Sequence, residues 1–183
     1  MSYIDEMLEF NKKFVDEKKY EVFPTLKYPA KKAVILTCMD TRLVELLPAA
    51  LNLKNSDVKM IKNAGAIVAH PFGSVMRSLI IAIYELGVEE ILIIGHLDCG
   101  VQGMSASRLI SKMTERNIEK EKIDFISNCG IDIDKWLKGF DSVEDSVSKT
   151  VNLIKTHPLI PSDVQIHGFV IDPETGKLEK VTE

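Results

Sequence analysis

Hydrophobic and polar residues follow one another along the chain in two different rhythms. Between Ser2 and Tyr20 apolar residues recur at helical spacing, so that Ile4, Leu8 and Val15 share one face. The run from Ala33 to Thr37 is instead continuously apolar, which is typical of a strand covered on both faces. The first segment is therefore predicted to be an amphipathic helix and the second a buried strand.

The middle of the chain continues this alternation. A short helix is expected over residues 42–51 and a strand near Val58 to Ile61. The segment from Ser74 to Gly87 is apolar nearly all round and ends at a glycine, as a buried helix does. The run EEILIIGH, residues 89–96, then predicts another strand.

The last third of the chain predicts a helix followed by a hairpin. The helix opens at Ser142 and stops before Pro158. Its apolar stripe consists of Val143, Val147, Val151 and Ile154. The tail VQIHGFVIDPETGKLEKV reads as a strand, a Pro/Gly turn and a second strand. The segment 111–141 has a weaker pattern, and we expect surface helix and loop there, with Trp136 packed and Cys129 a buried or idle thiol.

Strands that alternate with helices predict an α/β fold. Its central β-sheet is expected to be mainly parallel and flanked by helices, with the C-terminal hairpin at one end. A chain of 183 residues, 45% of them hydrophobic, is long enough for one well-buried core, so a single domain spanning residues 1–183 is expected. In such sheets ligands gather at the carboxyl ends of the strands.

Charge and composition narrow the choice of partners. The chain has 23 basic and 27 acidic residues, a formal charge of -4 and no basic block, which argues against nucleic-acid binding. The first residues, MSYIDEMLEF, carry acids where a signal peptide needs positive charge, and no apolar run is as long as a membrane span. We therefore expect a cytoplasmic protein with a small-molecule substrate and no membrane partner.

Chemically distinctive residues follow two of the predicted strands. Cys38 ends the first strand and precedes Asp40 and Arg42, while GHLDCG places His96 and Cys99 in an H-x-x-C arrangement. Two thiolates and an imidazole, completed by water, form the Cys2His donor set of an open zinc site. Soft sulfur with a borderline nitrogen favours zinc over magnesium or calcium.

Other interpretations of these residues have less support. An isolated H-x-x-C also occurs where a cysteine is simply buried in a core. Cys38 and Arg42 in one loop resemble a cysteine phosphatase, but that chemistry needs a wider loop whose backbone amides surround phosphate. Asp40 and Arg42 could also form an ordinary surface ion pair.

Four segments together resemble the β-class carbonic anhydrases, especially their short prokaryotic forms. They are CMDTR, KNAG, SVMRSLIIAIYELGVEEILIIGHLDCG and HGFVIDPETGKL, and the similarity extends over nearly the whole chain from Lys31 onward. The combination of C-x-D-x-R with H-x-x-C is much more specific than either half. The family usually has serine where this chain has Thr41, a small change between two hydroxyl residues.

The resemblance implies a metal site and a reaction. Cys38, His96 and Cys99 would bind one Zn2+ per chain, and Asp40 with Arg42 would form a catalytic dyad. The implied reaction is reversible hydration of CO2 to bicarbonate and a proton through a zinc-bound hydroxide that the dyad orients.

The resemblance also implies further features of the site and the assembly. Gly65, in the family's NAG stretch, would line the substrate pocket, although a glycine there could also simply form a turn. Asp98 would either support the ligands or be a solvent-facing acid. The family assembles through dimers in which the N-terminal helix reaches over the partner, so a homodimer or a dimer-based oligomer is expected.

Two alternatives to a carbonic anhydrase remain at this point. Near relatives use the same zinc site to hydrolyse CS2 or COS, and the residue pattern does not separate these substrates. A noncatalytic zinc-binding or redox-sensing module is the other alternative. Asp40 and Arg42 argue against such a module, because a structural zinc site is usually closed by a fourth protein ligand and needs no oriented acid.

Overall fold

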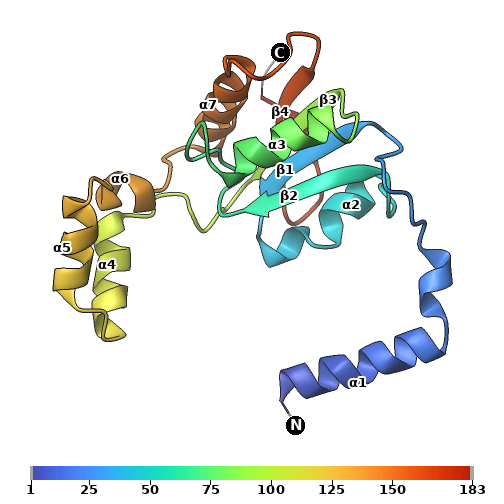
Figure 1. The fold of residues 1–183 in the computed structure, drawn as a ribbon, viewed down its shortest axis with the longest axis horizontal. Helices are drawn as coiled ribbons and strands as arrows, with labels where there is room; N and C mark the ends of the chain where they lie inside the picture. The colour runs from blue at the N-terminus through green and yellow to red at the C-terminus, as the bar shows by residue number, and fades with distance from the viewer. Residues whose placement is uncertain (1, 182–183) are drawn as a thin grey trace.

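A five-stranded sheet forms the centre of the computed structural model, which describes residues 2–181 (Figure 1). The strand order is β2-β1-β3-β4-β5. Four strands are parallel, and β5 runs antiparallel to β4 as the second arm of the predicted hairpin. The strands are β1 (Ala33–Cys38), β2 (Val58–Asn63), β3 (Glu90–His96), β4 (Gln165–Ile171) and β5 (Leu178–Lys180). The predicted α/β fold with its mainly parallel sheet is confirmed.

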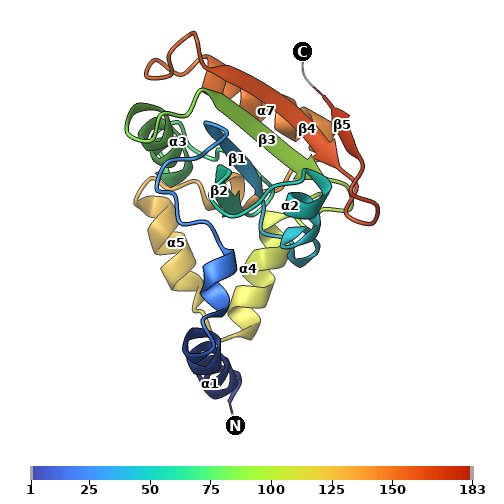
Figure 2. The same ribbon diagram turned by 90° about the vertical axis from the view of Figure 1, so that its right-hand side faces the viewer.

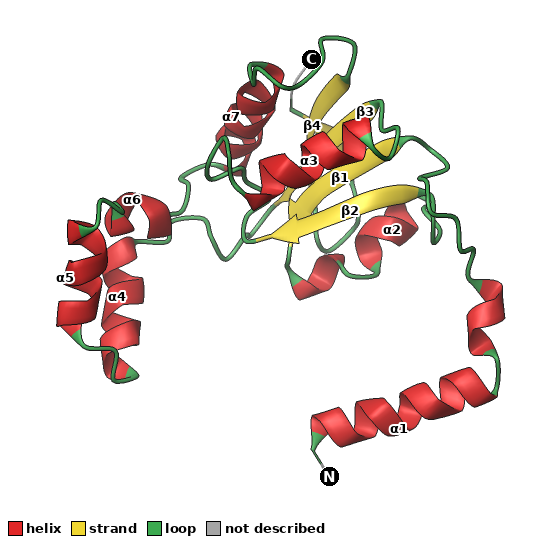
Figure 3. Cartoon of the chain, in the orientation of Figure 1, coloured by secondary structure: helices red, strands yellow, loops and turns green. Residues whose placement is uncertain are grey.

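Helices cover both faces of this sheet (Figure 3). On one face lie α3 and α7, and on the other α2 (Figure 1). The α-helices are α1 (Tyr3–Asp16), α2 (Leu46–Ala50), α3 (Ser74–Tyr84), α4 (Ala106–Glu115), α5 (Lys120–Asn128), α6 (Ile133–Leu137) and α7 (Val143–Lys155). Short 3-10 helices span Lys19–Val22 and Thr41–Leu43.

The core consists of two apolar clusters, one on each side of the sheet. β1 lies between them and all six of its residues are buried, which explains its uninterrupted apolar sequence. The first cluster joins the sheet to α3 and α7, and its fully buried members include Leu79, Ile91 and Ile154. The second joins it to the 3-10 helix Thr41–Leu43 through Leu43 and to α2 through Leu47. Cys38 and Cys99 belong to this second cluster, so the core holds both thiols in place.

Close packing of α7 on β3 depends on Gly95, the residue before His96. A Cβ atom at Gly95 would lie 2.7 Å from Cγ2 of Val143 and 2.8 Å from Cγ2 of Val147. These separations are far shorter than ordinary carbon contacts of about 3.5 to 4.0 Å. The missing side chain therefore lets the helix approach the end of the strand that carries His96.

Two parts of the chain stand away from the sheet (Figures 1 and 2). Residues 105–138, here called the arm, contain α4, α5 and α6 and resolve into helices what the sequence predicted only as surface helix and loop. Trp136 is 66% exposed, so the packing expected for it is not found within this chain, and Cys129 is exposed rather than buried. The other part is α1, which has no buried residue.

The predicted N-terminal helix is shorter than its sequence pattern. It ends at Asp16, and a 3-10 turn follows it. Among residues 2–181, no helix is both long and apolar enough to cross a bilayer.

Candidate metal centre

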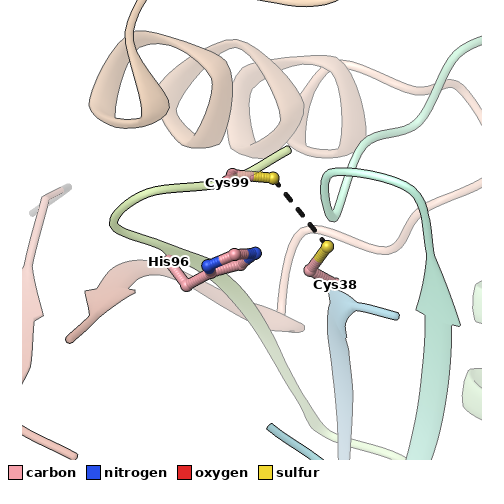
Figure 4. Close-up of side chains that lie close together, drawn as sticks. All are labelled: Cys38, His96 and Cys99. Atoms are coloured by element: carbon pink, nitrogen blue, oxygen red, sulfur yellow. Dashed lines mark hydrogen bonds between the residues drawn. The ribbon is translucent and has the colours of Figure 1, made fainter. Parts of the chain in front are cut away.

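The ends of β1 and β3 bring the candidate ligands together (Figure 4). These strands are parallel neighbours, so their carboxyl ends lie at the same edge of the sheet. Cys38 is the last residue of β1, His96 is the last of β3, and Cys99 follows in the loop after β3. All three residues are buried, and one donor atom from each lies within 4.8 Å of the others.

The spacing of these donor atoms fits a tetrahedral metal ion. The two sulfur atoms are 3.9 Å apart, whereas a disulfide bond requires about 2.05 Å. Two sulfurs bound to one zinc at about 2.3 Å and a tetrahedral angle would be about 3.8 Å apart. Nε2 of His96 is buried and lacks a hydrogen-bond partner in the part of the chain that the structure describes. A buried nitrogen without a partner beside two thiols is what a metal ligand needs, so the residues fit a zinc ion.

The other nitrogen of His96 is fixed by the backbone. Nδ1 lies 2.8 Å from the carbonyl oxygen of Leu97, which accepts a hydrogen bond if Nδ1 carries the proton. This tautomer leaves the Nε2 lone pair free for a metal ion. Burial lowers the pKa of His96, but the neighbouring Cys38 sulfur and the Leu97 carbonyl raise it by more, so that the pKa lies above its usual value.

The hydrogen bond between the two thiols shifts their pKa values in opposite directions. A hydrogen bond from Cys99 lowers the pKa of Cys38 most strongly, burial opposes it, and His96 and the Gly65 amide lower it further, to about 4. The hydrogen bond to Cys38 and burial both raise the pKa of Cys99. The lowered pKa of Cys38 favours its thiolate, the form that binds metals.

Asp40 and Arg42 form a two-pronged ion pair beside the ligands. Nε and Nη2 of Arg42 donate to the two carboxylate oxygens of Asp40 at 3.0 and 2.9 Å, and the Arg42 backbone N–H donates to Oδ1 at 2.9 Å. Hydrogen bonds from the Arg42 side chain lower the pKa of Asp40 to about 2. Oδ2 of Asp40 lies 3.7 Å from Nε2 of His96, so an ionised carboxylate stands next to the free ligand nitrogen.

Gly65 lies against Cys38 rather than in open space. Its backbone N–H donates to the Cys38 sulfur at 3.4 Å, and its φ of +85° is a conformation that glycine adopts at little cost. Asn63 closes the same turn through both ends of its side-chain amide, which bond to the backbone of Ile67. The sequence placed Gly65 near the site but gave no sign of its bond to the thiol.

Phe140 is a neighbour of the site that the sequence did not reveal. A Cβ atom at Gly65 would lie 3.0 Å from Cε1 of the Phe140 ring. Phe140 also packs against both core clusters. Because it follows the segment with the weakest sequence pattern, no spacing rule could have connected it with Gly65.

The fold and the donor set define the class of α/β proteins with a candidate Cys2His metal centre. Comparison with known families narrows this class. The family model described as carbonic anhydrase matches residues 33–178. The chain is 56% identical to the protein named "Putative carbonic anhydrase YvdA" of Bacillus subtilis, over 99% of this chain and 92% of that protein. It is 30% identical to β-carbonic anhydrase 1 of Mycobacterium bovis, over 84% of each.

Solved structures agree with the sequence comparisons. β-Carbonic anhydrase isoform I of Trichomonas vaginalis superimposes with a TM-score of 0.91 at 33% identity and covers 100% of this chain and 99% of its own. An apo form of carbon disulfide hydrolase matches with a TM-score of 0.71 at 25% identity, over 99% of this chain and 91% of its own. The chain belongs to the β-carbonic anhydrase family. These relatives support the prediction that it is an enzyme of the carbonic anhydrase type.

Proposed function

We propose that the protein catalyses the reversible hydration of CO2 to bicarbonate and a proton, with one Zn2+ per chain held by Cys38, His96 and Cys99. The observation that carries this proposal is the buried Cys-His-Cys cluster, whose free Nε2 faces an ionised carboxylate 3.7 Å away. A zinc ion, when bound, lowers the pKa of a water molecule to about 7 and so supplies a nucleophile for CO2 at neutral pH.

In this proposal the neighbouring residues prepare the site for that chemistry. Asp40 is an acceptor because Arg42 keeps it ionised, and it takes the hydrogen bond of the attacking oxygen and fixes its orientation. Arg42 also holds Asp40 in its pair, which restrains the carboxylate from binding the ion itself. Gly65 gives its N–H to Cys38, and we assign it to the wall of the substrate pocket.

Stopped-flow measurement of CO2 hydration, combined with zinc analysis, tests this proposal. The wild type should carry one zinc per chain and accelerate hydration. Asp40→Ala should keep its zinc and lose about 10²-fold or more of its activity, the usual range for loss of a group that positions a proton. Asp163→Ala, which removes an exposed loop acid before β4, serves as the matched control and should change neither.

Two results would contradict the proposal. One is a zinc-loaded wild type that hydrates CO2 no faster than buffer between neutral and alkaline pH. The other is a Cys99→Ser variant with full zinc content and full activity, which would exclude the ligand set.

Hydrolysis of CS2 or COS is a second candidate function on the same residues. A carbon disulfide hydrolase of Saccharolobus solfataricus is 30% identical over 80% of this chain and 75% of that protein. Sulfide release from CS2 by the zinc-loaded protein, measured beside CO2 hydration, separates the two functions. A protein that releases sulfide but does not hydrate CO2 would replace the first proposal with the second.

The proposal also includes a homodimer. The first two turns of α1 leave their apolar face uncovered within the described chain, where Ile4, Met7 and Leu8 are all exposed. An isolated helix of this length is only marginally stable in water, and an exposed apolar face is typical of an interaction site. We assign that cover to a second copy of the chain, on which α1 packs.

A further inference from the structure

Arg42 is held from two loops, not only from its own. Besides its two bonds to Asp40, Nη1 donates to Oδ2 of Asp98 at 2.9 Å and Nη2 donates to the Asp98 carbonyl oxygen at 2.9 Å. Four of the five guanidinium N–H groups are therefore engaged, two by each aspartate. Asp98 lies between His96, the last residue of β3, and Cys99, so Arg42 ties the loop after β1 to the loop after β3.

The backbone at Asp98 is shaped for this contact. Its φ is +54°, in the left-handed region that aspartate and asparagine tolerate better than most residues. In this conformation both the carbonyl and the carboxylate of Asp98 accept hydrogen bonds from the same guanidinium. The side chain is otherwise 86% exposed, so its contact with Arg42 is not a by-product of burial.

The position of Asp40 depends on this second anchor. The backbone N–H of Arg42 also holds Oδ1 of Asp40, but this bond lies within the same short loop as the ion pair. The loop and its ion pair could therefore move together toward His96. Oδ2 of Asp40 is already 3.7 Å from Nε2 of His96. The hydrogen bonds that Arg42 donates to Asp98 fix the other side of the guanidinium and oppose a movement of the pair toward His96.

We propose that Asp98 is a positioning residue that anchors Arg42 and, through it, keeps the Asp40 carboxylate from binding the metal ion held by Cys38, His96 and Cys99. This inference rests on the ligand set of the proposed function. It assigns a role to Asp98 that the sequence left open between a ligand support and a solvent-facing acid.

A positioning role and a purely electrostatic role for Asp98 predict opposite changes in the affinity of the metal site for an anion when Asp98 is removed. The inference can therefore be tested by anion binding. Removing a negative charge beside a metal site should tighten the binding of an anionic ligand. If Asp98 instead keeps Asp40 off the ion, its removal lets Asp40 compete, and the anion binds more weakly. The sign of the change distinguishes the two.

The experiment is a titration of the cobalt-substituted protein with azide, followed by the visible absorption of the metal. Asp98→Gly removes the carboxylate and preserves the left-handed backbone, and Asp98→Asn preserves shape but not charge. We expect the azide dissociation constant to rise about two- to fivefold in Asp98→Gly, the range that an exposed ion pair supplies, and less in Asp98→Asn. Asp163→Asn, an exposed loop acid at the other edge of the sheet, should leave it unchanged.

A double-mutant comparison tests the route through Asp40. In an Asp40→Asn background the competing carboxylate is absent, so adding Asp98→Gly should no longer weaken azide binding. Weakening that persists in this background would overturn the inference, as would unchanged or tighter binding in the single variants.

These results are distinguishable from failure of the proposed function. A wild type that takes up no cobalt or zinc would overturn both. A wild type that binds metal and hydrates CO2, with azide affinity insensitive to Asp98, would overturn only the role of Asp98.

Discussion

Two helices of this protein, α1 and α7, are built alike and placed differently. Each begins at a serine whose hydroxyl accepts a hydrogen bond from a backbone N–H three residues later, at 3.2 Å in both. Each has an apolar stripe on one face. Six residues of α7 are buried against the sheet, whereas α1 has none.

The difference teaches that an amphipathic pattern specifies a face to be covered, but not the surface that covers it. For α7 that surface is supplied by β3 and β4 of the same chain (Figure 2). For α1 the described chain supplies only the short segment that follows it, where Phe23 lies beside Phe14. The proposed homodimer would have to cover the rest of the apolar face. Substitutions in α7 should therefore change the stability of the folded chain, whereas substitutions in α1 should change the association of two chains.

The largest effect is expected from cutting back the buried stripe. Ile154 in α7 is fully buried, and Ile154→Ala should lower the free energy of unfolding by about 2–5 kcal/mol, because it removes buried methyl groups and leaves a cavity. Urea unfolding of the dilute protein measures this loss.

The matched control is the same substitution in the other helix. Ile4 is 60% exposed in α1, and Ile4→Ala should cost less than about 0.5 kcal/mol under the same conditions. If Ile4→Ala lowered the free energy of unfolding as much as Ile154→Ala does, α1 would be packed on its own chain, and the difference between α1 and α7 would not exist.

A smaller effect is expected from adding one carbon between α7 and the sheet. Gly95→Ala places a Cβ atom within 3 Å of Val143 and Val147, so the helix or the end of β3 must shift. We expect a loss of about 1–3 kcal/mol in the free energy of unfolding, the usual cost of overpacking. Because His96 is the next residue, zinc affinity should also fall.

The double variant Gly95→Ala with Val147→Ala shows whether this steric conflict is the cause. Val147→Ala opens space for the added carbon, so the double variant should be less destabilised than the sum of the two single changes. Additive losses would show that the new Cβ atom does not collide with Val147.

The fold and the meeting of Cys38, His96 and Cys99 could be predicted because each strand and its last residues can be recognised from a short stretch of sequence. Each central strand is an apolar run, and Cys38 and His96 stand where two such runs stop. Parallel strands bring these ends to one edge, so strand order alone places the donors together. The same logic recovered the hairpin of β4 and β5, whose Pro/Gly turn lies between two short strands.

The other features of the site and the arm depend on how the loops run in space, which residue spacing in the sequence does not determine. Asp98 reaches Arg42 from a left-handed backbone conformation. Phe140 comes near Gly65 because the chain returns to the sheet after the arm. The helices of the arm are short and rich in charged residues, so their hydrophobic pattern is weak. The first of them, α4, begins at Ala106, before the segment 111–141 for which surface helix was predicted. The exposure of Trp136 likewise follows from the arm standing away from the sheet, which its own sequence does not show.

The smallest effect on folding is expected at Leu8 in α1. This residue also gives the most direct test of whether α1 is covered by a second copy, as α7 is covered by its own chain. Leu8 is 59% exposed and makes no core contact in the described chain, so Leu8→Ala should change the unfolding of the separated chain by less than about 0.5 kcal/mol. If a second copy covers this face, the same variant loses apolar burial at two symmetry-related places in the dimer. Sedimentation velocity over a concentration series should then show weaker self-association than the wild type. Glu6→Ala, on the polar face of the same helix, should leave association unchanged, and equal behaviour of all three proteins would show that α1 does not bind a partner copy.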